Sequence, residues 1–381
     1  MRIALFTHTC YPFTNGVAVS VEQLTEKLIS NGHEVIIVTN NYRKFKNDFS
    51  NNKRLKVISI PIYYQKLRVP LLFNFRLFKE LDKYNIQIVH SHSDFGLALL
   101  SRVYARKHHL PLIQTYHCNY LGYAKKNFGR LSYFIFYIPV KLYTKLLCKT
   151  ADRVIVPSIT TKKLLEEKFK VKKELDYIPN GVNLSKFNNN LLDVSSLRKE
   201  LKISKDDFVL LSLSRLSKEK GISTIISLLK ELKDCDKLKL LIVGGGTEEK
   251  KLKKLVNKIK LDNVIFTGEI PFEKVQYYYA LANAFITNSY AETQGLTIIE
   301  ALSSNTLVIC PNISIYQEII NDDNGMLFKN NSELINIIRY CYNNKNKIKK
   351  LNIRKTVEHF SLDITVKKVE KIYQEELNKN K

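Results

Sequence analysis

The sequence lacks the features that mark several common protein classes. Its six cysteines are scattered and include no Cys-x-x-Cys pair, which excludes a disulfide framework and a zinc site and fits a reducing compartment. No apolar run approaches the ~20 residues that a membrane-spanning helix needs. The stretch from Met1 to His8 is too briefly apolar for a signal peptide, so we expect it to form a strand. There is no Gly-x-Gly-x-x-Gly motif, which disfavours a nicotinamide dinucleotide.

Acidic residues are scarce in the first half of the chain. The net charge is +25, of which residues 1–190 carry +18 and residues 191–381 only +7. A general Lys- and Asn-rich bias would spread over the whole chain. The asymmetry therefore indicates a polyanionic surface partner for the first half, either a membrane or a nucleic acid.

Short apolar runs alternate with amphipathic stretches in the first half. The amphipathic stretches predict helices at Val17–Ser30, which is followed by the capping signal Asn31-Gly32, and near Phe95–His108. The alternation is typical of a parallel sheet covered on both faces by helices. The predicted strands are Ile3–Thr7, Glu34–Thr39, Leu55–Ile60, Ile86–His90, Leu112–Tyr116 and Arg153–Val156.

A polar, turn-rich stretch between residues 180 and 197 indicates a domain boundary, after which the alternation restarts. We therefore expect an α/β fold of two doubly wound, Rossmann-like domains, residues 1–185 and 186–360, which face a cleft. Residues 361–381 are predicted to form an amphipathic helix that packs back on the first domain. The elements expected in the second domain are strands at Phe208–Ser214, Leu238–Gly244, Val264–Gly268 and Asn283–Ser289, and helices at Ile222–Lys233, Glu248–Ile259 and Leu296–Ser304.

The segment Tyr290–Glu300 has the pattern of a binding site. A buried strand precedes it and a helix begins at Leu296, so the backbone N–H groups of the turn and the helix dipole form a site for an anion such as phosphate. Glu292 lies in the turn and Glu300 inside the helix, and carboxylates accept hydrogen bonds from hydroxyls. Two carboxylates beside a phosphate cradle suit a nucleotide sugar. The alternative is a helix start that carries solvated acidic side chains.

Further candidates follow predicted strands and so lie at the expected cleft. Arg215 and Lys220, between a strand and a helix, are placed to neutralise a diphosphate, unless they are surface charges only. Gly244 ends a strand where a ligand could approach the backbone. Asn15 and Gly16 occupy the corresponding turn before the first helix, which could also be a plain strand-to-helix turn.

Histidines end two strands of the first domain. His117 would face the cleft if the strand predicted at Leu112–Tyr116 forms, although a lone histidine more often has a structural role. His90 and His92 could suggest a metal, but no third ligand has matching spacing. We interpret these two as cleft lining and expect no metal.

Taken in order, these motifs resemble glycosyltransferase family 4, a family of retaining enzymes with the GT-B fold. The resemblance covers nearly the whole chain, and the ordered set is specific although each member alone is not. Its segments are Asn15-Gly16-Val17, Thr115-Tyr116-His117, Ile178 to Val182, Arg215 with Lys220, and the Glu292/Glu300 pair.

The resemblance implies a role for each candidate residue. Arg215 and Lys220 would bind the donor diphosphate, which the loop at Gly16 would meet from the other side. Glu300 would bind the donor ribose, and Glu292 a hydroxyl of the transferred sugar. The other implied contacts are His117, near the reacting carbon, and the substrate-binding positions Asn15, Gly244, Gln294, Gly295, Leu296 and Thr297.

The implied chemistry needs neither a metal nor another cofactor. Arg215, Lys220 and the helix start would stabilise the charge that develops on the leaving diphosphate, and together with His117 and Glu292 the two cations form the expected catalytic set. Family members retain the anomeric configuration by a front-face route in which the donor phosphate takes the acceptor proton. That route would explain why no pair of carboxylates is arranged as in retaining glycosidases.

The variant Glu292-Thr-Gln-Gly-Leu296 is similar to that of bacterial 1,2-diacylglycerol 3-glucosyltransferases. It implies transfer of a hexose, glucose from UDP-glucose, to a membrane lipid such as diacylglycerol. The basic, aromatic-rich segments Leu67–Lys79 and Lys125–Lys145 support a lipid acceptor, because such helices bind at anionic bilayer surfaces. We therefore expect a cytoplasmic protein that is peripheral on the inner face of the cell membrane. The alternative is that these segments simply pack on the sheet.

Three other functions remain open at this point. A nucleic-acid-binding protein would use the basic first half but would leave Glu292 and Glu300 without a role, so we expect no nucleic-acid partner. An epimerase with the GT-B fold would need no acceptor. A family 4 transferase that acts on a surface polysaccharide or another lipid carrier is the main alternative.

Overall fold

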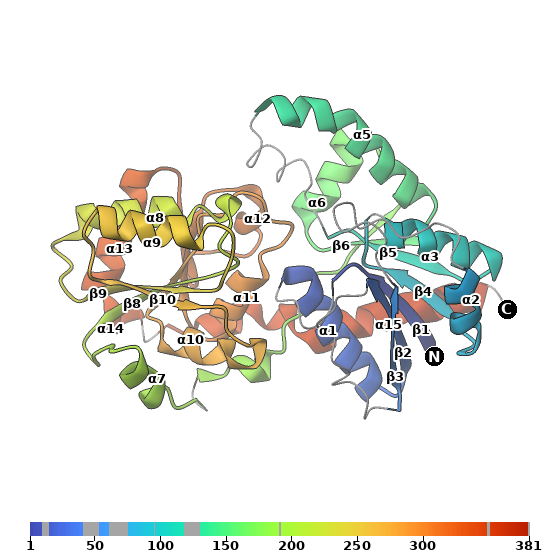
Figure 1. Ribbon diagram of the computed structural model, residues 1–381, viewed down its shortest axis with the longest axis horizontal. Coiled ribbons are helices and arrows are strands. Elements are labelled where there is room, and N and C mark those ends of the chain that lie inside the picture. Colours follow the sequence, from blue (N-terminus) through green and yellow to red (C-terminus); the bar gives the residue numbers. More distant parts are fainter. Residues whose placement is uncertain are drawn as a thin grey trace. The chain divides into compact units, whose positions relative to one another are not determined.

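The computed structural model describes residues 1–9, 15–40, 53–60, 75–94, 96–117, 130–189, 192–348 and 351–379, with side chains omitted at residues 75 and 130–134. The chain forms two compact units (Figure 1). The first unit includes Met1–Leu121, Phe134–Gly181 and Leu362–Lys381, and the second includes Val182–Ser361.

The first unit contains a parallel sheet in the order β3-β2-β1-β4-β5-β6-β7. Its interior strand β1 (Arg2–Thr7) is buried from Ile3 to Phe6, which explains the continuous apolar run, since helices cover both faces of a parallel sheet. The other strands are β2 (Glu34–Asn40), β3 (Leu55–Ile60), β4 (Ile88–Ser91), β5 (Leu112–Thr115), β6 (Arg153–Val156) and β7 (Leu175–Tyr177). The described helices of this unit are α1 (Gly16–Ser30), α2 (Phe75–Asp82), α3 (Gly96–Lys107), α5 (Arg130–Lys149), α6 (Ile159–Lys163) with the π-helical turn η1 (Leu164–Lys168), and α15 (Leu362–Lys379).

The C-terminal helix α15 is part of the first unit and lies beside α1 (Figure 1). Its Val366 and Tyr373 are fully buried in the same apolar cluster as Leu28 of α1. Arg153 of β6 forms ion pairs with Asp176 of β7 at 2.6 Å and with Glu375 of α15 at 2.8 Å. Apolar packing and ion pairs therefore fix α15 to the sheet.

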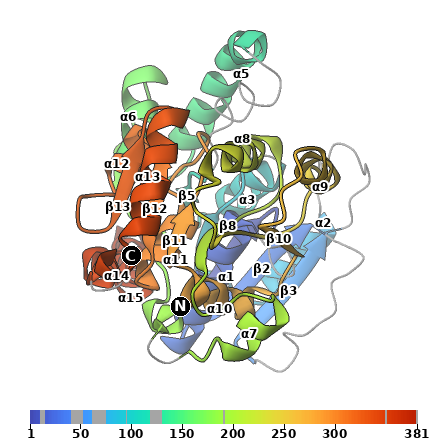
Figure 2. The same cartoon turned by 90° about the vertical axis from the view of Figure 1, so that its left-hand side faces the viewer.

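The second unit contains a parallel sheet in the order β10-β9-β8-β11-β12-β13, and Figure 2 shows β8, β11, β12 and β13 side by side. Its strands are β8 (Phe208–Leu213), β9 (Leu238–Val243), β10 (Val264–Gly268), β11 (Ala284–Ile286), β12 (Leu307–Pro311) and β13 (Gly325–Phe328). The α-helices are α7 (Ser195–Glu200), α8 (Ile222–Leu228), α9 (Glu249–Lys258), α10 (Val275–Leu281), α11 (Leu296–Ser303), α12 (Ser314–Gln317), α13 (Asn331–Asn343) and α14 (Lys345–Ile348). The 3₁₀ turns are η2 (Leu184–Phe187), η4 (Lys218–Lys220), η5 (Leu229–Leu232), η6 (Phe272–Lys274) and η7 (Ile353–Phe360).

The predicted architecture of two doubly wound parallel sheets is confirmed, with local differences. The helix expected at Ile222–Lys233 ends as an α-helix at Leu228 and continues as the 3₁₀ turn η5. Strand β4 begins at Ile88 rather than Ile86, although Gln87 still contacts Arg2: its backbone N–H donates to the carbonyl of Arg2 at 2.9 Å, and its side chain accepts from the N–H of Arg2 at 3.0 Å.

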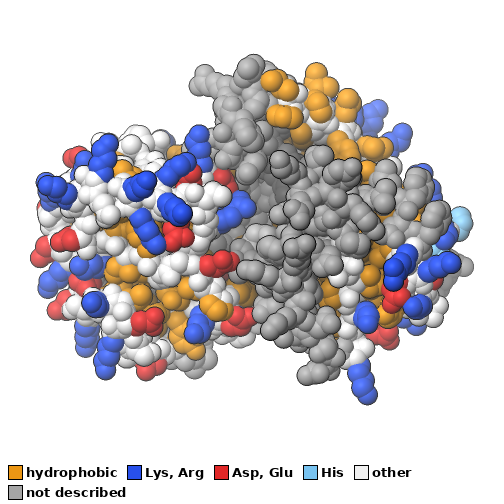
Figure 3. Space-filling view, viewed as in Figure 1, with side chains coloured by type: hydrophobic (Ala, Val, Ile, Leu, Met, Phe, Trp, Pro, Cys, Tyr) orange, Lys and Arg blue, Asp and Glu red, His pale blue; other side chains and the backbone are white. Residues whose placement is uncertain are grey.

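Helix α5 exposes apolar side chains along one face (Figure 3). Ile135, Phe136, Ile138, Leu142 and Leu146 are each 47–62% exposed, although burial of such side chains is normally favourable. No helix in the described part of the chain is both long and apolar enough to cross a membrane.

Candidate active site

The predicted anion site is the start of α11, in the second unit. Gly295 precedes the helix with a φ of 94°, a left-handed conformation that suits glycine. A Cβ atom at this position would lie 3.2 Å from the ring of Tyr316, so a larger residue would also require that ring to shift slightly. Gly295 offers no side-chain cap, and the first-turn N–H groups of Leu296 and Thr297 can therefore serve an anion. Gln294, just before the glycine, is buried.

Glu292 and Lys220 form a half-buried ion pair beside this helix start. The Nζ atom of Lys220 lies 2.5 Å from Oε1 of Glu292, and each side chain is 22% exposed. The hydroxyl of Ser289 donates to the same oxygen at 2.8 Å, and the backbone carbonyl of Ser289 accepts from the hydroxyl of Tyr316. Because both contacts use Oε1, the second oxygen, Oε2, is the one that a ligand hydroxyl could reach.

A left-handed glycine brings Lys220 to this position. Gly221, between η4 and α8, has a φ of 65°, and its carbonyl accepts from the side-chain amide of Asn288 at 3.3 Å. A Cβ on Gly221 would come within 2.7 Å of the carbonyl oxygen of Asn288. The close approach joins the loop after β8 to the loop after β11, and so places a cation from the first loop beside a carboxylate from the second.

Arg215 lies in the same loop but has a different partner. Its Nη2 donates to Oε1 of Glu219 at 2.9 Å, while its side chain remains 56% exposed. Burial acts to raise the pKa of Glu219, but hydrogen bonds from Ser217 and Arg215, together with a backbone bond, outweigh it and hold this pKa below its usual value. Glu219 therefore stays ionised and orients the exposed guanidinium.

Gly244 contributes to the packing of these loops. Its φ is 129°, and a Cβ here would lie 2.1 Å from the carbonyl oxygen of Ser214. The backbone N–H of Leu216 also donates to the carbonyl of Gly245 at 2.8 Å. The loop after β9 thus supports the loop that carries Arg215.

Glu300 is buried within α11, at 4% exposure. The hydroxyl of Tyr279, from α10, donates to its Oε2 at 2.8 Å. Burial raises the pKa of Glu300 to about 7, against the opposing effects of the Tyr279 hydrogen bond and of the positive charge on Lys186. Glu300 is thus a carboxyl group poised to change its charge near neutral pH.

Asn15 and Gly16 form the start of α1 in the first unit. The side-chain oxygen of Asn15 accepts from the backbone N–H groups of Val17 and Ala18 at 3.1 and 3.0 Å, so it is a helix cap. Gly16 is exposed, which leaves the backbone at this helix start open to a ligand. Residues 10–14 of the predicted loop lie outside the described residues.

His117 follows β5 and is buried in the first unit beside two other histidines. Its Nε2 lies 2.9 Å from Nδ1 of His92, and the two rings stack. His90 contacts the hydroxyl of Tyr373 at 2.6 Å and that of Thr115 at 2.7 Å. Burial lowers the pKa of His90 to about 3 and that of His117 to about 4, and lowers that of His92 well below its usual value. All three imidazoles are therefore neutral at pH 7.

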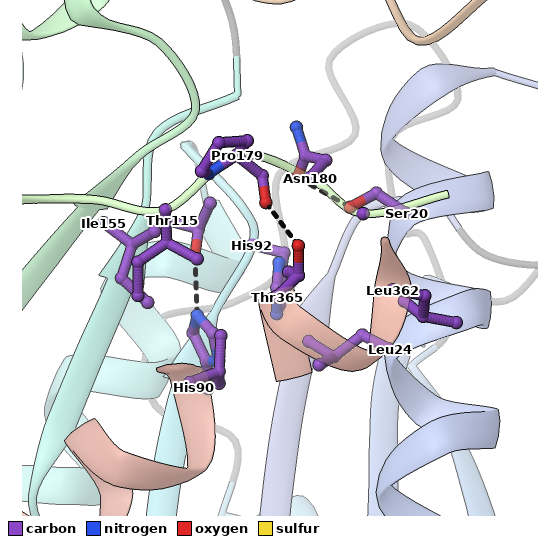
Figure 4. Close-up of a pocket in the computed structure, with 13 residues that line it drawn as sticks. Ser20, Leu24, His90, His92, Thr115, Ile155, Pro179, Asn180, Leu362 and Thr365 are labelled. Carbon is purple, nitrogen blue, oxygen red and sulfur yellow. Dashed lines mark hydrogen bonds between the residues drawn. The ribbon is translucent and has the colours of Figure 1, made fainter. Parts of the chain in front are cut away.

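His90 and His92, expected to line an open cleft, are instead covered by α15 and adjoin a small cavity of about 20 Å³ (Figure 4). This volume suffices for about one water molecule. Figure 4 shows the bond between His90 and Thr115 on one side of the cavity and that between Ser20 and Asn180 on the other. Among the described residues, no group of three or more His, Cys, Asp or Glu side chains could hold a metal.

The predicted site residues thus lie at strand ends and on the adjoining helices of both units. In the second unit these are Arg215, Lys220, Gly244, Glu292, Glu300 and the start of α11. In the first unit they are Asn15, Gly16 and His117. Sequence reasoning missed two supporting residues. Glu219 could have been found from its place between two candidate cations, four residues after Arg215. Tyr279 carries no such signal, since it lies 21 residues before Glu300 and in another helix.

Comparison with known proteins gives consistent matches over both units. Residues 14–186 match the family model described as Glycosyltransferase Family 4, and residues 193–357 match that of glycosyl transferases group 1. The alpha-monoglucosyldiacylglycerol synthase of Streptococcus pneumoniae is 36% identical over 84% of this chain and 74% of its own. The synthase of the same name from Acholeplasma laidlawii is 29% identical over 100% of this chain and 98% of its own.

Solved structures show the same fold. A sucrose-phosphate synthase from Thermosynechococcus elongatus superposes with a TM-score of 0.79 at 23% identity, over 98% of both chains. The Anabaena protein HepE, in complex with UDP and glucose, also has a TM-score of 0.79, at 17% identity over 98% of this chain and 99% of its own. The matched families, the two parallel sheets and these neighbours confirm the predicted GT-B fold. The chain therefore belongs to glycosyltransferase family 4 and is related to the alpha-monoglucosyldiacylglycerol synthases.

Proposed function

We propose that the protein transfers a hexose, glucose from UDP-glucose, to a membrane lipid such as diacylglycerol, with retention of anomeric configuration. The observation that carries the proposal is the start of α11, where an uncapped helix lies between Glu292 with its Lys220 partner and the buried Glu300. The names of the relatives from Streptococcus pneumoniae and Acholeplasma laidlawii support the lipid acceptor.

The cations of the second unit suit the departure of a diphosphate. Lys220 is held by Glu292, and Arg215 by Glu219, so both are oriented before a ligand arrives. Preorganised charges of this kind stabilise a leaving group without reorganisation during the reaction. Together with the N–H groups at the start of α11, these cations would stabilise the negative charge on the leaving diphosphate, so the reaction would not require a metal ion.

The carboxylates suit hydroxyl groups on the two sides of that diphosphate. Glu292, with Oε1 occupied by Lys220 and Ser289, would use Oε2 to accept from a hydroxyl of the transferred sugar. Glu300 would accept from the ribose. An ion-paired Glu292 is suited to hydroxyl binding rather than to nucleophilic attack, which supports the front-face route to retention.

His117 would contact the donor sugar as a neutral imidazole. Burial keeps its pKa near 4, so the ring adds no charge beside the reacting carbon at neutral pH. In that state it has one donor and one acceptor nitrogen, and its Nε2 is already engaged with His92.

Helix α5 supports attachment to an anionic membrane, on the inner face of the cell membrane. Its exposed apolar face carries Ile138 and Leu142, each at least 60% exposed, and Lys141 and Lys145 flank that face. An exposed apolar face with neighbouring lysines suits the boundary between headgroups and acyl chains. The other segment expected at the membrane, Leu67–Lys79, differs in its described part, because Leu77 and Phe78 are buried and the ring of Phe78 packs on Tyr104 of α3.

The test is incubation with labelled UDP-glucose and diacylglycerol vesicles, followed by lipid extraction. We expect label in a glucosylated diacylglycerol, and expect Glu292→Gln to reduce its formation by about 10- to 100-fold, since loss of a charged hydrogen bond costs roughly 1.5–3 kcal/mol. Label that enters only a polysaccharide or another lipid carrier would overturn the diacylglycerol assignment and favour the alternative acceptor.

A further inference from the structure

We propose that Tyr279 is a positioning residue for Glu300, whose Oε2 it occupies so that Oε1 is directed to the donor ribose. The inference rests on the proposed function, in which Glu300 binds the ribose of the nucleotide. It goes beyond that proposal because Tyr279 itself touches no part of the donor.

The contact has a fixed direction. The hydroxyl of Tyr279 lies 2.8 Å from Oε2 of Glu300, and both residues are buried. Burial, and the nearby charge of Glu300, raise the pKa of Tyr279 well above its usual value. The phenol therefore stays protonated around neutral pH, where it donates to Oε2 of Glu300.

The ring of Tyr279 is held in place from several sides. It packs edge-on against Phe187 of η2 and at a tilt against Phe285 of β11, each with ring centroids 5.8 Å apart. Its backbone carbonyl accepts from the hydroxyl of Thr306 at 3.1 Å. A donor with so little freedom can hold the carboxyl group in a single orientation.

The hydrogen bond also affects the charge of Glu300. The hydrogen bond favours the carboxylate and so lowers the pKa of Glu300, as does the positive charge of Lys186. Burial favours the protonated form and raises this pKa. Other groups around α11 have their own partners or are exposed. Arg354 of η7 donates to the backbone carbonyls of Ser303 and Leu184. The remaining titratable side chains on the packed elements are the exposed Lys355, Glu358 and His359 of η7, the half-buried Tyr277 and buried Tyr278 of α10, and the buried Cys310 of β12.

The pH dependence of nucleotide binding follows from this arrangement. A protonated carboxyl group is a poorer acceptor for ribose hydroxyls, so binding weakens as the pH falls through the pKa of Glu300, which is about 7. Without the Tyr279 hydroxyl this pKa is higher, and the weakening begins at a higher pH. A shift of one pKa unit changes binding about tenfold at a pH below both values.

The experiment measures UDP binding by calorimetry between pH 6 and 9 for the wild type, Tyr279→Phe and Tyr278→Phe. Tyr278 is the matched control, because it is the adjacent buried tyrosine on the same helix. We expect Tyr279→Phe to bind within about threefold of the wild type at pH 9 and about tenfold more weakly at pH 6.5. Tyr278→Phe should follow the wild type. Superimposable profiles for all three proteins, or equal shifts in both variants, would overturn the proposal.

A second readout does not depend on ligand binding. In protein labelled with ¹³C at the glutamate carboxyl carbons, the resonance of Glu300 is identified by its loss in Glu300→Gln. We expect its titration to move to a higher pH in Tyr279→Phe and to stay in place in Tyr278→Phe. If UDP fails to bind at any pH, the proposed donor is wrong, and this titration still decides the role of Tyr279.

Discussion

The ammonium group of Lys220 lies 2.5 Å from Oε1 of Glu292, across two loops that are 72 residues apart in the chain. Since each side chain is 22% exposed, solvent screens the pair less than an ordinary surface pair. We predict a coupling free energy of about 1 kcal/mol or more in a double-mutant cycle of Lys220→Met and Glu292→Gln, measured by urea denaturation. The Lys251–Glu248 pair, whose lysine is 75% exposed, is the control and should give at most about 0.5 kcal/mol. Equal coupling in the two cycles would contradict the prediction.

Arg215→Ala and Lys220→Ala should each reduce the rate of transfer. Both cations lie in the loop after β8, where they would meet a departing diphosphate. Removal of one electrostatic stabiliser typically costs ~10²–10³ in rate. Activity should persist in EDTA, because the positive charge comes from side chains. Loss of activity in EDTA with rescue by magnesium would show that a metal takes part. Lys253→Ala on α9 is a control for removal of a lysine outside the site.

Glu219→Gln should reduce the rate less than Arg215→Ala does. Its carboxylate holds Nη2 of Arg215 and accepts from Ser217 at 2.6 Å, so the variant loosens the guanidinium without removing it. We expect a decrease of about tenfold in steady-state transfer, equivalent to about 1.4 kcal/mol. A variant that matched the wild type in transfer would show that Arg215 needs no such support.

The protein should bind anionic vesicles through α5 and the basic residues that precede it in the sequence. Arg130, Lys141 and Lys145 belong to α5, whereas Lys125 and Lys126 lie outside the described residues. Changing these five residues to Gln should weaken co-sedimentation, since five such residues contribute up to ~5 kcal/mol at low salt. The effect should shrink as ionic strength rises. Equal binding to zwitterionic and anionic vesicles would remove the electrostatic part of the prediction.

The apolar face of α5 gives a separate test. Ile138→Ser with Leu142→Ser should weaken vesicle binding without loss of stability, because these side chains are 62% and 60% exposed. Ile364→Ser, on the exposed side of α15 at 40% exposure, is the matched control and should bind like the wild type. Should the double variant keep full binding at both low and high salt, α5 would not insert.

The histidine cluster should make the first unit sensitive to acid. The pKa of His90 is lowered to about 3, so between that value and the unfolded value near 6.5 the unfolded chain binds more protons, and stability falls as the pH falls. From pH 6.5 to 4.5 one such imidazole accounts for about 2–3 kcal/mol. His90→Gln should flatten this dependence in thermal or urea denaturation. His109→Asn, an exposed position with a φ of 52° that asparagine tolerates, should leave it unchanged.

The sequence was sufficient to predict the fold, and it also nominated the residues of the candidate site, because the signals for both are local. Strands β1 and β8 are largely apolar runs. Lys220 and Glu292 lie in the segments that follow β8 and β11, which are neighbouring strands of a parallel sheet, so their carboxyl ends meet at the same edge. Tyr279 and His92 could not be assigned, because their contacts with Glu300 and His117 depend on the packing of side chains between elements. The burial of His90 likewise depends on Tyr373, 283 residues further along the chain. Strand β7, of three residues, is too short to show a pattern.

The placement of α15 has a consequence for the order in which the chain can fold during its synthesis. The second unit consists mainly of Val182–Ser361, all of which is made before α15, so it can close once Ser361 has left the ribosome. The first unit, although made earlier, lacks part of its core until Val366, Val369 and Tyr373 emerge. The domain that is translated first is therefore the one that completes its folding last.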